Sequence, residues 1–394
     1  MASSRAKRAR PELANPQAAL SGSSPLHSDW RDWASLTAGP AALIAERALS
    51  NDVADYVRFR TVCTAWRALC PDPRAQEISD RRFHPRQWIM LPSNFNVDRR
   101  RCFVNVSTGE KIHVGILDLR RYYFRGPTAE GFLVLCQKST HVVQLLNPIT
   151  GQVTDLPCAN TLLDPDPDPV TTDQLRSLDF CSAGVTNDNT VALLYDFHKF
   201  AIAKPGQEAW RRLDVGQHRI MAALPFAGRM YCVTEKKILV VDEDNTSASP
   251  RLVVVADFKL EREFSLLYDR MHPVFDERGG LVLVHRTHRF IENRFTEKFT
   301  AYRARLDAGI MEPIRGLGGQ ALFICSSHPA GPSQSVPAKF SSSIKPDTIY
   351  LCRKYSDVNQ VDIVAFDPSA GTFVETEFDK KDIVKFLIAY VVTS

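Results

Sequence analysis

The sequence predicts a mainly β protein in which a small α-helical module precedes a six- or seven-bladed β-propeller and a helix closes the chain. Three observations lead to this fold class. Apolar residues recur at helical spacing only near the N-terminus and again after residue 378. Between these stretches, from about residue 85 to residue 378, short apolar or alternating runs follow one another. A turn pattern also recurs, with Gly109 and Gly151 about 42 residues apart, a spacing typical of a four-stranded blade.

The first 28 residues combine Arg and Lys with Ser, Ala and Pro, a composition that predicts a disordered basic tail. The bases of Arg5 to Arg10 equal the whole formal net charge of +4, so the rest of the chain is close to neutral and predicts no nucleic-acid partner. This run is either a nuclear localisation patch or a solvated tail. No secretory signal or membrane-spanning run is visible, and we expect no membrane partner and a location in the nucleus and/or cytoplasm.

Residues 29–75 predict the helical module. A first helix is expected from Ala41 to Leu49, and Asn51 or Asp52 supplies a cap for a second helix that carries its apolar stripe on to Trp66. A segment of about forty residues with two or three short helices buries too little surface to fold alone, so we expect the module to pack on the domain that follows or on a partner.

At these residues the sequence resembles a known family. The patterns W-x-x-L, L-I-A-E-R and D-V-A-D-Y-V-R-F-R-x-V-C-x-x-W-R are similar to the F-box of plant proteins that join it to a KIB-type β-propeller. The resemblance implies docking on the Skp adaptor of a cullin ubiquitin ligase, with the propeller presenting an unidentified target protein. The adaptor-binding residues that it implies are Leu36, Pro40, Leu43, Ile44, Val62, Cys63 and Trp66.

One departure from the family concerns the segment that would face the adaptor. Where the family has Leu-Pro and an acidic residue, this chain has Leu36, Thr37, Ala38 and Gly39. A threonine and a glycine leave more backbone freedom to be lost on binding than a proline does. We therefore expect docking to be weakened or lost.

Residues 85–378 predict the propeller. Twelve runs read as strands, and they are Trp88 to Leu91, Cys102 to Val106, Phe132 to Cys136, Val142 to Leu146, Thr190 to Tyr195, Arg229 to Val233, Ile238 to Val241, Leu252 to Val255, Leu281 to Val284, Ala321 to Cys325, Thr348 to Cys352 and Val361 to Phe366. The segments 103–114, 141–157 and 361–378 share a strand, a turn that ends in Gly and a second strand, which predicts three hairpins. The period leaves room for six or seven blades.

The resemblance continues across this region at Pro273-Val274-Phe275, at the LGGQALF run from Leu317 to Phe323, and at KPDTIYL from Lys345 to Leu351. By contrast, residues 330–337 are rich in Gly, Pro and Ser and are expected to form a loop. Residues 379–394 carry apolar side chains at helical spacing and predict a closing helix that covers the propeller edge or packs on the F-box.

Motifs for catalysis are absent from this sequence. No nucleophile elbow, P-loop or paired-carboxylate pattern stands in a supporting context, and His285 and His288 lack the accompanying ligands of a metal site. We expect no enzyme activity, no cofactor and no metal. Two other functions stay open. One is a scaffold or inhibitor with a degenerate F-box, and the other is an enzyme that uses the central channel, although no set of residues in the sequence supports the latter.

Overall fold

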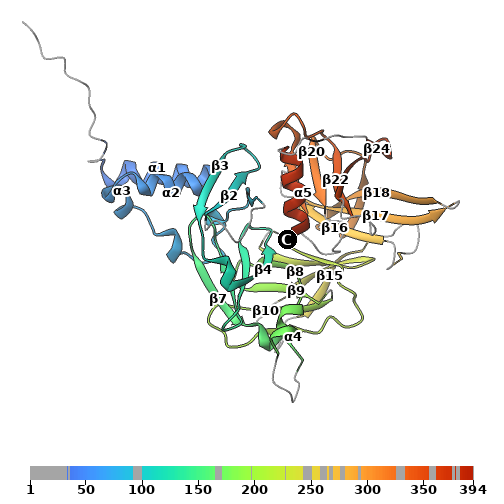
Figure 1. Cartoon of the computed structure of the whole chain (residues 1–394), viewed down its shortest axis with the longest axis horizontal. Helices are drawn as coiled ribbons and strands as arrows, with labels where there is room; N and C mark the ends of the chain where they lie inside the picture. The colour runs from blue at the N-terminus through green and yellow to red at the C-terminus, as the bar shows by residue number, and fades with distance from the viewer. Residues whose placement is uncertain are drawn as a thin grey trace, which may run out of the picture.

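The computed structural model describes residues 33, 36–91, 100–164, 171–196, 198–226, 228–242, 251–257, 264–265, 269–275, 280–291, 294–324, 333–354, 361–374, 378 and 382–393. The predicted basic tail lies outside these residues. Three helices project from one side of a ring of β-sheets (Figure 1), and they are α1 (Ala38–Asn51), α2 (Val53–Thr61) and α3 (Thr64–Ala68). Two short 3-10 helices, η2 (Pro73–Ala75) and η3 (Arg81–Phe83), connect them to the first strand.

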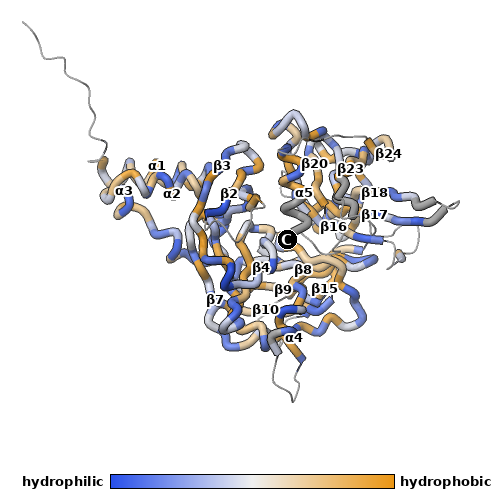
Figure 2. The backbone as a smooth tube through the Cα atoms, viewed as in Figure 1, coloured by the Kyte–Doolittle hydropathy of each residue, from blue (hydrophilic) through white to orange (hydrophobic). Residues whose placement is uncertain are grey.

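The first helix is longer than predicted because Pro40 lies in its first turn, where a backbone N–H has no partner within the helix. Ala41, Ala45 and Leu49 follow at intervals of four residues and are buried. Asp52 caps α2, since its carboxylate accepts a hydrogen bond from the Ala54 N–H at 2.6 Å. Hydrophobic and hydrophilic positions alternate along both helices (Figure 2), so one face of each is available to the core.

The prediction that the second helix continues to Trp66 is wrong. The helix α2 ends at Thr61, and Cys63 adopts an extended backbone with φ of −155°. The Cys63 Sγ then accepts a hydrogen bond from the Trp66 N–H at 3.4 Å, which caps the separate helix α3. Three β-branched residues, Thr61, Val62 and Thr64, flank the break, and such residues lose side-chain freedom in a helix.

In the described part of the chain the strands form six sheets, so of the two predicted blade numbers six is correct. The first sheet has three strands, four sheets have four and the last has five. In chain order the strands are β1 (Trp88–Met90), β2 (Arg100–Asn105), β3 (Lys111–Gly115); β4 (Tyr122–Pro127), β5 (Leu133–Gln137), β6 (Val142–Leu146), β7 (Val153–Cys158); β8 (Phe180–Val185), β9 (Val191–Tyr195), β10 (Lys199–Ala203), β11 (Arg211–Leu213); β12 (Ala222–Phe226), β13 (Arg229–Val233), β14 (Lys237–Asp242), β15 (Arg251–Asp257); β16 (Asp269–Phe275), β17 (Leu281–Ile291), β18 (Arg294–Arg305), β19 (Ile310–Ile314); and β20 (Gln320–Ile324), β21 (Gln334–Pro337), β22 (Thr348–Lys354), β23 (Val361–Asp367), β24 (Thr372–Val374).

Six hydrophobic clusters close the ring, because each lies between two successive sheets. One cluster joins Val134 of the second sheet to Leu193 of the third, and equivalent clusters follow around the ring. The last cluster joins Phe323 of the sixth sheet to Val104 of the first. Each sheet is therefore covered on both faces, which explains why its middle strands read as continuous apolar runs in the sequence. The innermost strands β4, β8, β12, β16 and β21 of the second to sixth sheets lie next to one another at the centre.

The three predicted hairpins are present and share one turn. At Asn105, Asn147 and Asp367 the side-chain Oδ1 accepts a hydrogen bond from the backbone N–H two residues later, at 2.8, 3.1 and 2.8 Å. The Gly four residues later has φ of 76°, 74° and 70°, a left-handed conformation that favours glycine. The sequence pattern thus specified the turn through an Asx acceptor at its start and a glycine at its end.

The last sheet differs from the prediction in one strand. The predicted loop at 330–337 contains β21, which pairs antiparallel with β20 and occupies the centre-facing edge of the sheet, while β20 and β22 pair in parallel. Its residues Gln334 to Pro337 show no apolar alternation, since the strand lies beside the central channel instead of inside a sheet. The closing helix α5 (Ile383–Thr393) packs on β20 and β22 of the same sheet (Figure 1), where Val384 and Leu387 are fully buried in the cluster shared with the first sheet, so it packs on the propeller.

Short helices also lie in the connections between strands. The helix α4 (Thr172–Ser177) begins with a capping box at Thr171, after η5 (Ala159–Leu162). The turns η4 (Leu119–Arg121) and η6 (Ala338–Phe340) precede β4 and β22. No helix in the described residues is long and apolar enough to cross a bilayer.

Candidate functional site

Exposed apolar side chains gather on the helical module. Among the described residues nine large hydrophobic side chains are exposed, and five of them belong to this module. These five are Trp33 (56% exposed), Leu43 (74%), Ile44 (42%), Val62 (62%) and Leu69 (36%), and we call them the exposed apolar set. The four others are dispersed over the propeller strands. Exposed hydrophobic residues that gather on one small element are typical of an interaction surface.

The predicted adaptor-binding residues divide into two groups. Pro40, Leu43, Ile44 and Val62 are exposed and open to a partner. Leu36, Cys63 and Trp66 are half-buried, and Leu36 and Trp66 pack against the core that the module shares with the propeller. The second group is therefore only partly open to a partner, and its packing helps to hold the exposed residues in place.

Trp66 shows how this support is built. Its ring stacks on Phe59 with centroids 4.5 Å apart and an angle of 20° between the planes. Its Nε1–H donates a hydrogen bond to the Trp33 carbonyl at 2.9 Å. The residue thus connects α3 to α2 and to the chain before α1, and holds Trp33 near the helices.

A second set of bonds fixes the end of the module. The Tyr56 hydroxyl donates a hydrogen bond to the Pro71 carbonyl at 2.8 Å, and Arg60 Nη1 donates to the same carbonyl at 2.7 Å. Burial raises the pKa of Tyr56, so it stays a neutral donor. The segment that leaves α3 is therefore held against α2, and the three helices form one rigid unit.

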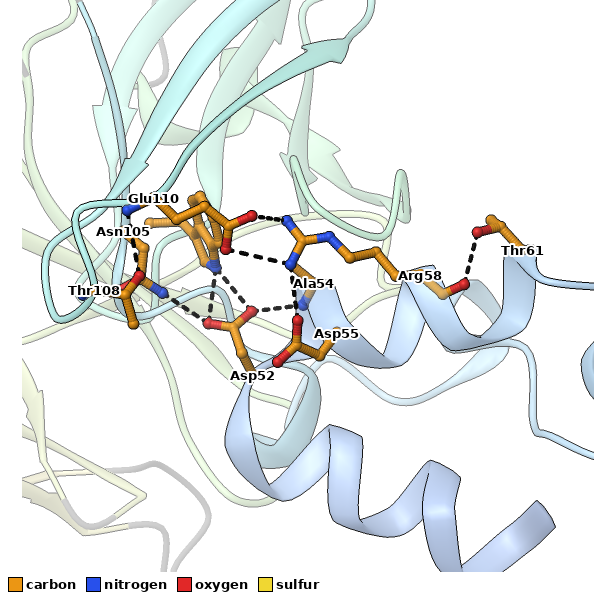
Figure 3. Close-up of polar contacts among 9 residues, drawn as sticks. Asp52, Ala54, Asp55, Arg58, Thr61, Asn105, Thr108 and Glu110 are labelled. Carbon is orange, nitrogen blue, oxygen red and sulfur yellow. Dashed lines mark hydrogen bonds and ion pairs between the residues drawn. The ribbon is translucent and has the colours of Figure 1, made fainter.

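Asp52 joins this unit to the propeller (Figure 3). Its carboxylate accepts hydrogen bonds from the Trp88 indole Nε1–H at 2.9 and 3.0 Å and from the Asn105 Nδ2 amide at 2.8 Å, in addition to the capping bond. Trp88 is in β1 and Asn105 is the last residue of β2, where the turn begins, and both are 2% exposed. Burial raises the pKa of Asp52, an effect that the hydrogen bond from Trp88 opposes.

Arg58 makes a second link between the module and the first sheet (Figure 3). Its guanidinium contacts Asp55 at 2.8 Å and both carboxylate oxygens of Glu110, the residue that follows the β2–β3 turn. All three side chains are more than 40% exposed. Solvent screens such pairs, so this link orients the module more than it stabilises it.

A common hydrophobic core completes the connection. Leu49, Tyr56 and Phe59 of the helices lie in one cluster with Trp88 and Leu135 of the propeller. The expectation that the module packs on the following domain is confirmed. The hydrophobic core therefore continues from the module into the propeller.

Sequence reasoning missed the role of Asn105 and Asn147 in this connection. Asn147 Nδ2 donates a hydrogen bond to the Phe83 carbonyl at 2.9 Å, as Asn105 does to Asp52. Both residues belong to the predicted turn motif, whose Oδ1 forms the turn and leaves the amide N–H free for another partner. The same turn also forms with Asp, as at Asp367, so an Asn at the other two positions was the sequence signal for an additional hydrogen bond.

His285, which the sequence offered as a metal ligand, makes other contacts in the structure. His285 is 7% exposed, stacks on Phe264 and lies 3.8 Å from Asp269 Oδ2. The Asp269 carboxylate is already bound by the Arg289 guanidinium, with Nη2 to Oδ2 at 2.9 Å. Within the described residues no three His, Cys, Asp or Glu side chains are grouped as metal ligands.

These features define a class of protein: a six-bladed β-propeller suited to protein binding, with a helical module fixed to its first sheet. The family follows from sequence. Residues 87–378 match the model of the KIB1-4 beta-propeller, and the chain belongs to that family. A search of curated proteins finds no match.

Comparison with solved structures gives low similarity. A luciferin-regenerating enzyme is 16% identical with a TM-score of 0.26, over 49% of this chain and 57% of that one. A streptogramin B lyase is 10% identical with a TM-score of 0.32, over 66% and 70%. The Cps50 (Swd1) β-propeller domain of Myceliophteria thermophila is 8% identical with a TM-score of 0.34, over 70% and 79%. This chain therefore spans a little over half of the first of these structures.

Proposed function

We propose that this protein is the substrate-recognition subunit of a Skp-cullin-F-box ubiquitin ligase of a plant. Its helical module docks on the Skp adaptor, its propeller binds the protein to be modified, and partner subunits catalyse ubiquitin transfer. The protein itself is not an enzyme and needs no cofactor. The observation that carries the proposal is the exposed apolar set on a module with the sequence pattern of an F-box.

Physical chemistry supports a partner at this surface. Leu43, Ile44 and Val62 leave large parts of their side chains in water, whereas Ala41, Ala45 and Leu49 on the same module are buried. Burial of apolar area contributes about 25 cal/mol per Å², so covering the exposed side chains would favour association. The rigid connection through Asp52 and the shared core reduces the freedom that the module loses on binding.

The departure at Thr37 favours a second candidate function. Thr37 is the N-cap residue of α1 but its side chain makes no capping hydrogen bond, and Gly39 follows in the first turn. If these residues prevent docking, the protein is a scaffold or inhibitor whose propeller masks a target while the degenerate F-box braces the fold. Adaptor binding distinguishes the two functions.

The experiment measures binding of the full chain to a Skp adaptor by calorimetry. The variants Leu43→Asp and Val62→Asp place a charge in the exposed apolar set, and we expect each to weaken binding at least tenfold because a charge in an apolar interface is desolvated. Ile310→Asp is the matched control, since Ile310 is 46% exposed but lies in β19 of the propeller.

Two results would contradict the proposal in different ways. In one, the parent chain shows no adaptor binding while its melting curve shows that it is folded. In the other, Ile310→Asp weakens binding as much as Leu43→Asp does. The first result would favour the scaffold, and the second would exclude the exposed apolar set as the docking surface.

A further inference from the structure

A cavity of about 570 Å³ lies at one end of the central channel. All six sheets contribute to it, together with residues 79–87 that connect the module to the propeller. One lining residue from each sheet in turn is Val106, Ala129, Asn187, Phe226, Phe275 and Gln334. This volume is within the range of about 300–1,000 Å³ that is usual for small-molecule sites.

The wall contributed by the fourth and fifth sheets is apolar and aromatic. Phe226 ends β12 and Phe275 ends β16, and their rings stack with centroids 5.3 Å apart and 23° between planes. Both are half-buried, while Leu224 and Val274 beside them are buried. A flat apolar body can pack against such a pair of rings.

The wall contributed by residues 79–87 and the second sheet is polar. Arg81, Arg86 and Glu130 line the cavity there. In a ring of six sheets the first and second lie opposite the fourth and fifth, so these three residues face the aromatic pair. The cavity is thus divided into a polar and an apolar side, as a site for an amphipathic molecule is.

His84 holds Arg86 without adding charge. Its Nε2 lies 2.7 Å from the Ile78 carbonyl, which can only accept, so Nε2 carries the proton and Nδ1 accepts from Arg86 Nη2 at 3.4 Å. Burial lowers the pKa of His84 to about 4, and the imidazole is neutral near pH 7. The local charge therefore comes from Arg81 and Arg86.

Glu130 supplies an unused hydrogen-bonding group. Its side chain is 3% exposed, its Oε1 accepts from the Val185 N–H at 3.2 Å, and its Oε2 makes no hydrogen bond of normal geometry, although the Thr128 hydroxyl is close enough to lower the pKa of the carboxyl. Burial raises the pKa of this carboxyl, which favours the protonated form with a free O–H donor. A buried hydrogen-bonding group without a well-formed bond destabilises the fold, and a bound ligand can remove that cost.

We propose that this cavity binds a small organic anion with an aromatic or extended apolar body. The anionic group accepts hydrogen bonds from Arg81, Arg86 and the Glu130 carboxyl, and the apolar body packs on Phe226 and Phe275. This site is separate from the helical module, so it does not depend on adaptor docking.

The test uses three probes of equal size with the full chain: 2-naphthoate, the neutral 2-naphthalenemethanol and the cation 2-naphthylmethylammonium. Calorimetry at pH 7 should show that the anion binds roughly 10- to 100-fold more tightly than the alcohol, because charged hydrogen bonds are the stronger ones. The cation should bind most weakly. Tighter binding of the cation, or no binding of the anion at millimolar concentration, would overturn the proposal.

Substitutions then locate the site. Arg86→Met should weaken naphthoate binding about tenfold or more and leave the alcohol within about twofold. Arg82→Met is the matched control, since Arg82 is in the same segment but pairs with Asp80 at 2.8 Å and does not line the cavity. Equal effects of the two variants on naphthoate would overturn the proposal.

Glu130 provides an independent check. Glu130→Gln keeps a donor and should hold naphthoate affinity within about threefold, whereas Glu130→Met removes the donor and should weaken it about tenfold. Melting curves and the affinity for the alcohol show whether each variant retains its fold. If Glu130→Met is folded and binds naphthoate like the parent, Glu130 is not part of the site and the proposed donor set is wrong.

Discussion

Asp52→Ala tests the connection between the helical module and the propeller most directly. The substitution removes the acceptor for the Trp88 indole N–H and for the Asn105 amide, both on residues that are 2% exposed. Each buried donor left without a partner costs about 1–3 kcal/mol. Loss of the cap on α2 costs about 0.5–2 kcal/mol more.

These costs are not fully additive, because the three donors share one carboxylate. Burial already raises the pKa of Asp52, so part of the cost of holding its charge disappears with the side chain. We therefore expect Asp52→Ala to lower the free energy of unfolding by about 3–5 kcal/mol. Urea denaturation, followed by tryptophan fluorescence, measures the change.

Asp55→Ala is the control for this prediction. Asp55 is the next acid on α2, but it is 44% exposed and pairs only with the exposed Arg58 among the described contacts. The expected cost is below about 1 kcal/mol. If both variants lose the same free energy, or if Asp52→Ala loses less than about 1 kcal/mol, the reasoning on buried donors is wrong.

Two further predictions concern acid stability and adaptor affinity. Burial lowers the pKa of His272 to about 3 and that of His84 to about 4, so the unfolded chain binds more protons below pH 6.5 and stability falls as pH decreases from about 6.5 towards these values. Between pH 7 and pH 5, each of these two histidines should lower the free energy of unfolding by about 2 kcal/mol. In His272→Leu, the drop measured by urea denaturation should be smaller by that amount, and an unchanged drop would contradict the buried neutral imidazole. Thr37 has φ of −64°, the value that a proline ring imposes, so Thr37→Pro should raise adaptor affinity about two- to fivefold in calorimetry. Equal or weaker binding would show that the missing Leu-Pro is not a matter of backbone freedom, and absence of binding by both folded proteins would favour the scaffold.

The sequence predicted strands best where both faces are buried. All twelve predicted runs lie at strands, because residues such as those of β9 and β13 pack against a neighbouring sheet on each side and are apolar throughout. The missed strands are of two kinds. Innermost ones such as β21 and β16 line the channel and carry polar residues, and outer ones such as β19 are largely exposed to solvent. Periodicity cannot separate these from loops.

The candidate docking surface was predicted by resemblance and not by pattern. Helical spacing places Leu43 and Leu49 on a helix but does not say which one the propeller covers; the structure leaves Leu43 74% exposed and Leu49 5% exposed. The same spacing assigned Val62 to a continuous stripe, although the helix ends before it. Long-range contacts decide such questions, and Glu130 is a further case because only the fold brings it to the same cavity as Phe226.

The rigid connection also limits what the proposed ligase can do. A target on the propeller must be held at a fixed distance from the adaptor, since ubiquitin transfer requires the reacting groups to meet. The continuous core around Tyr56 and Trp88, together with the Asp52 bonds, supplies that fixed geometry without a flexible linker. If the proposed function is correct, a loosened connection would therefore reduce ubiquitination of the target more than it reduces adaptor binding, because the exposed apolar set lies on the module itself while the proposed target site lies on the propeller.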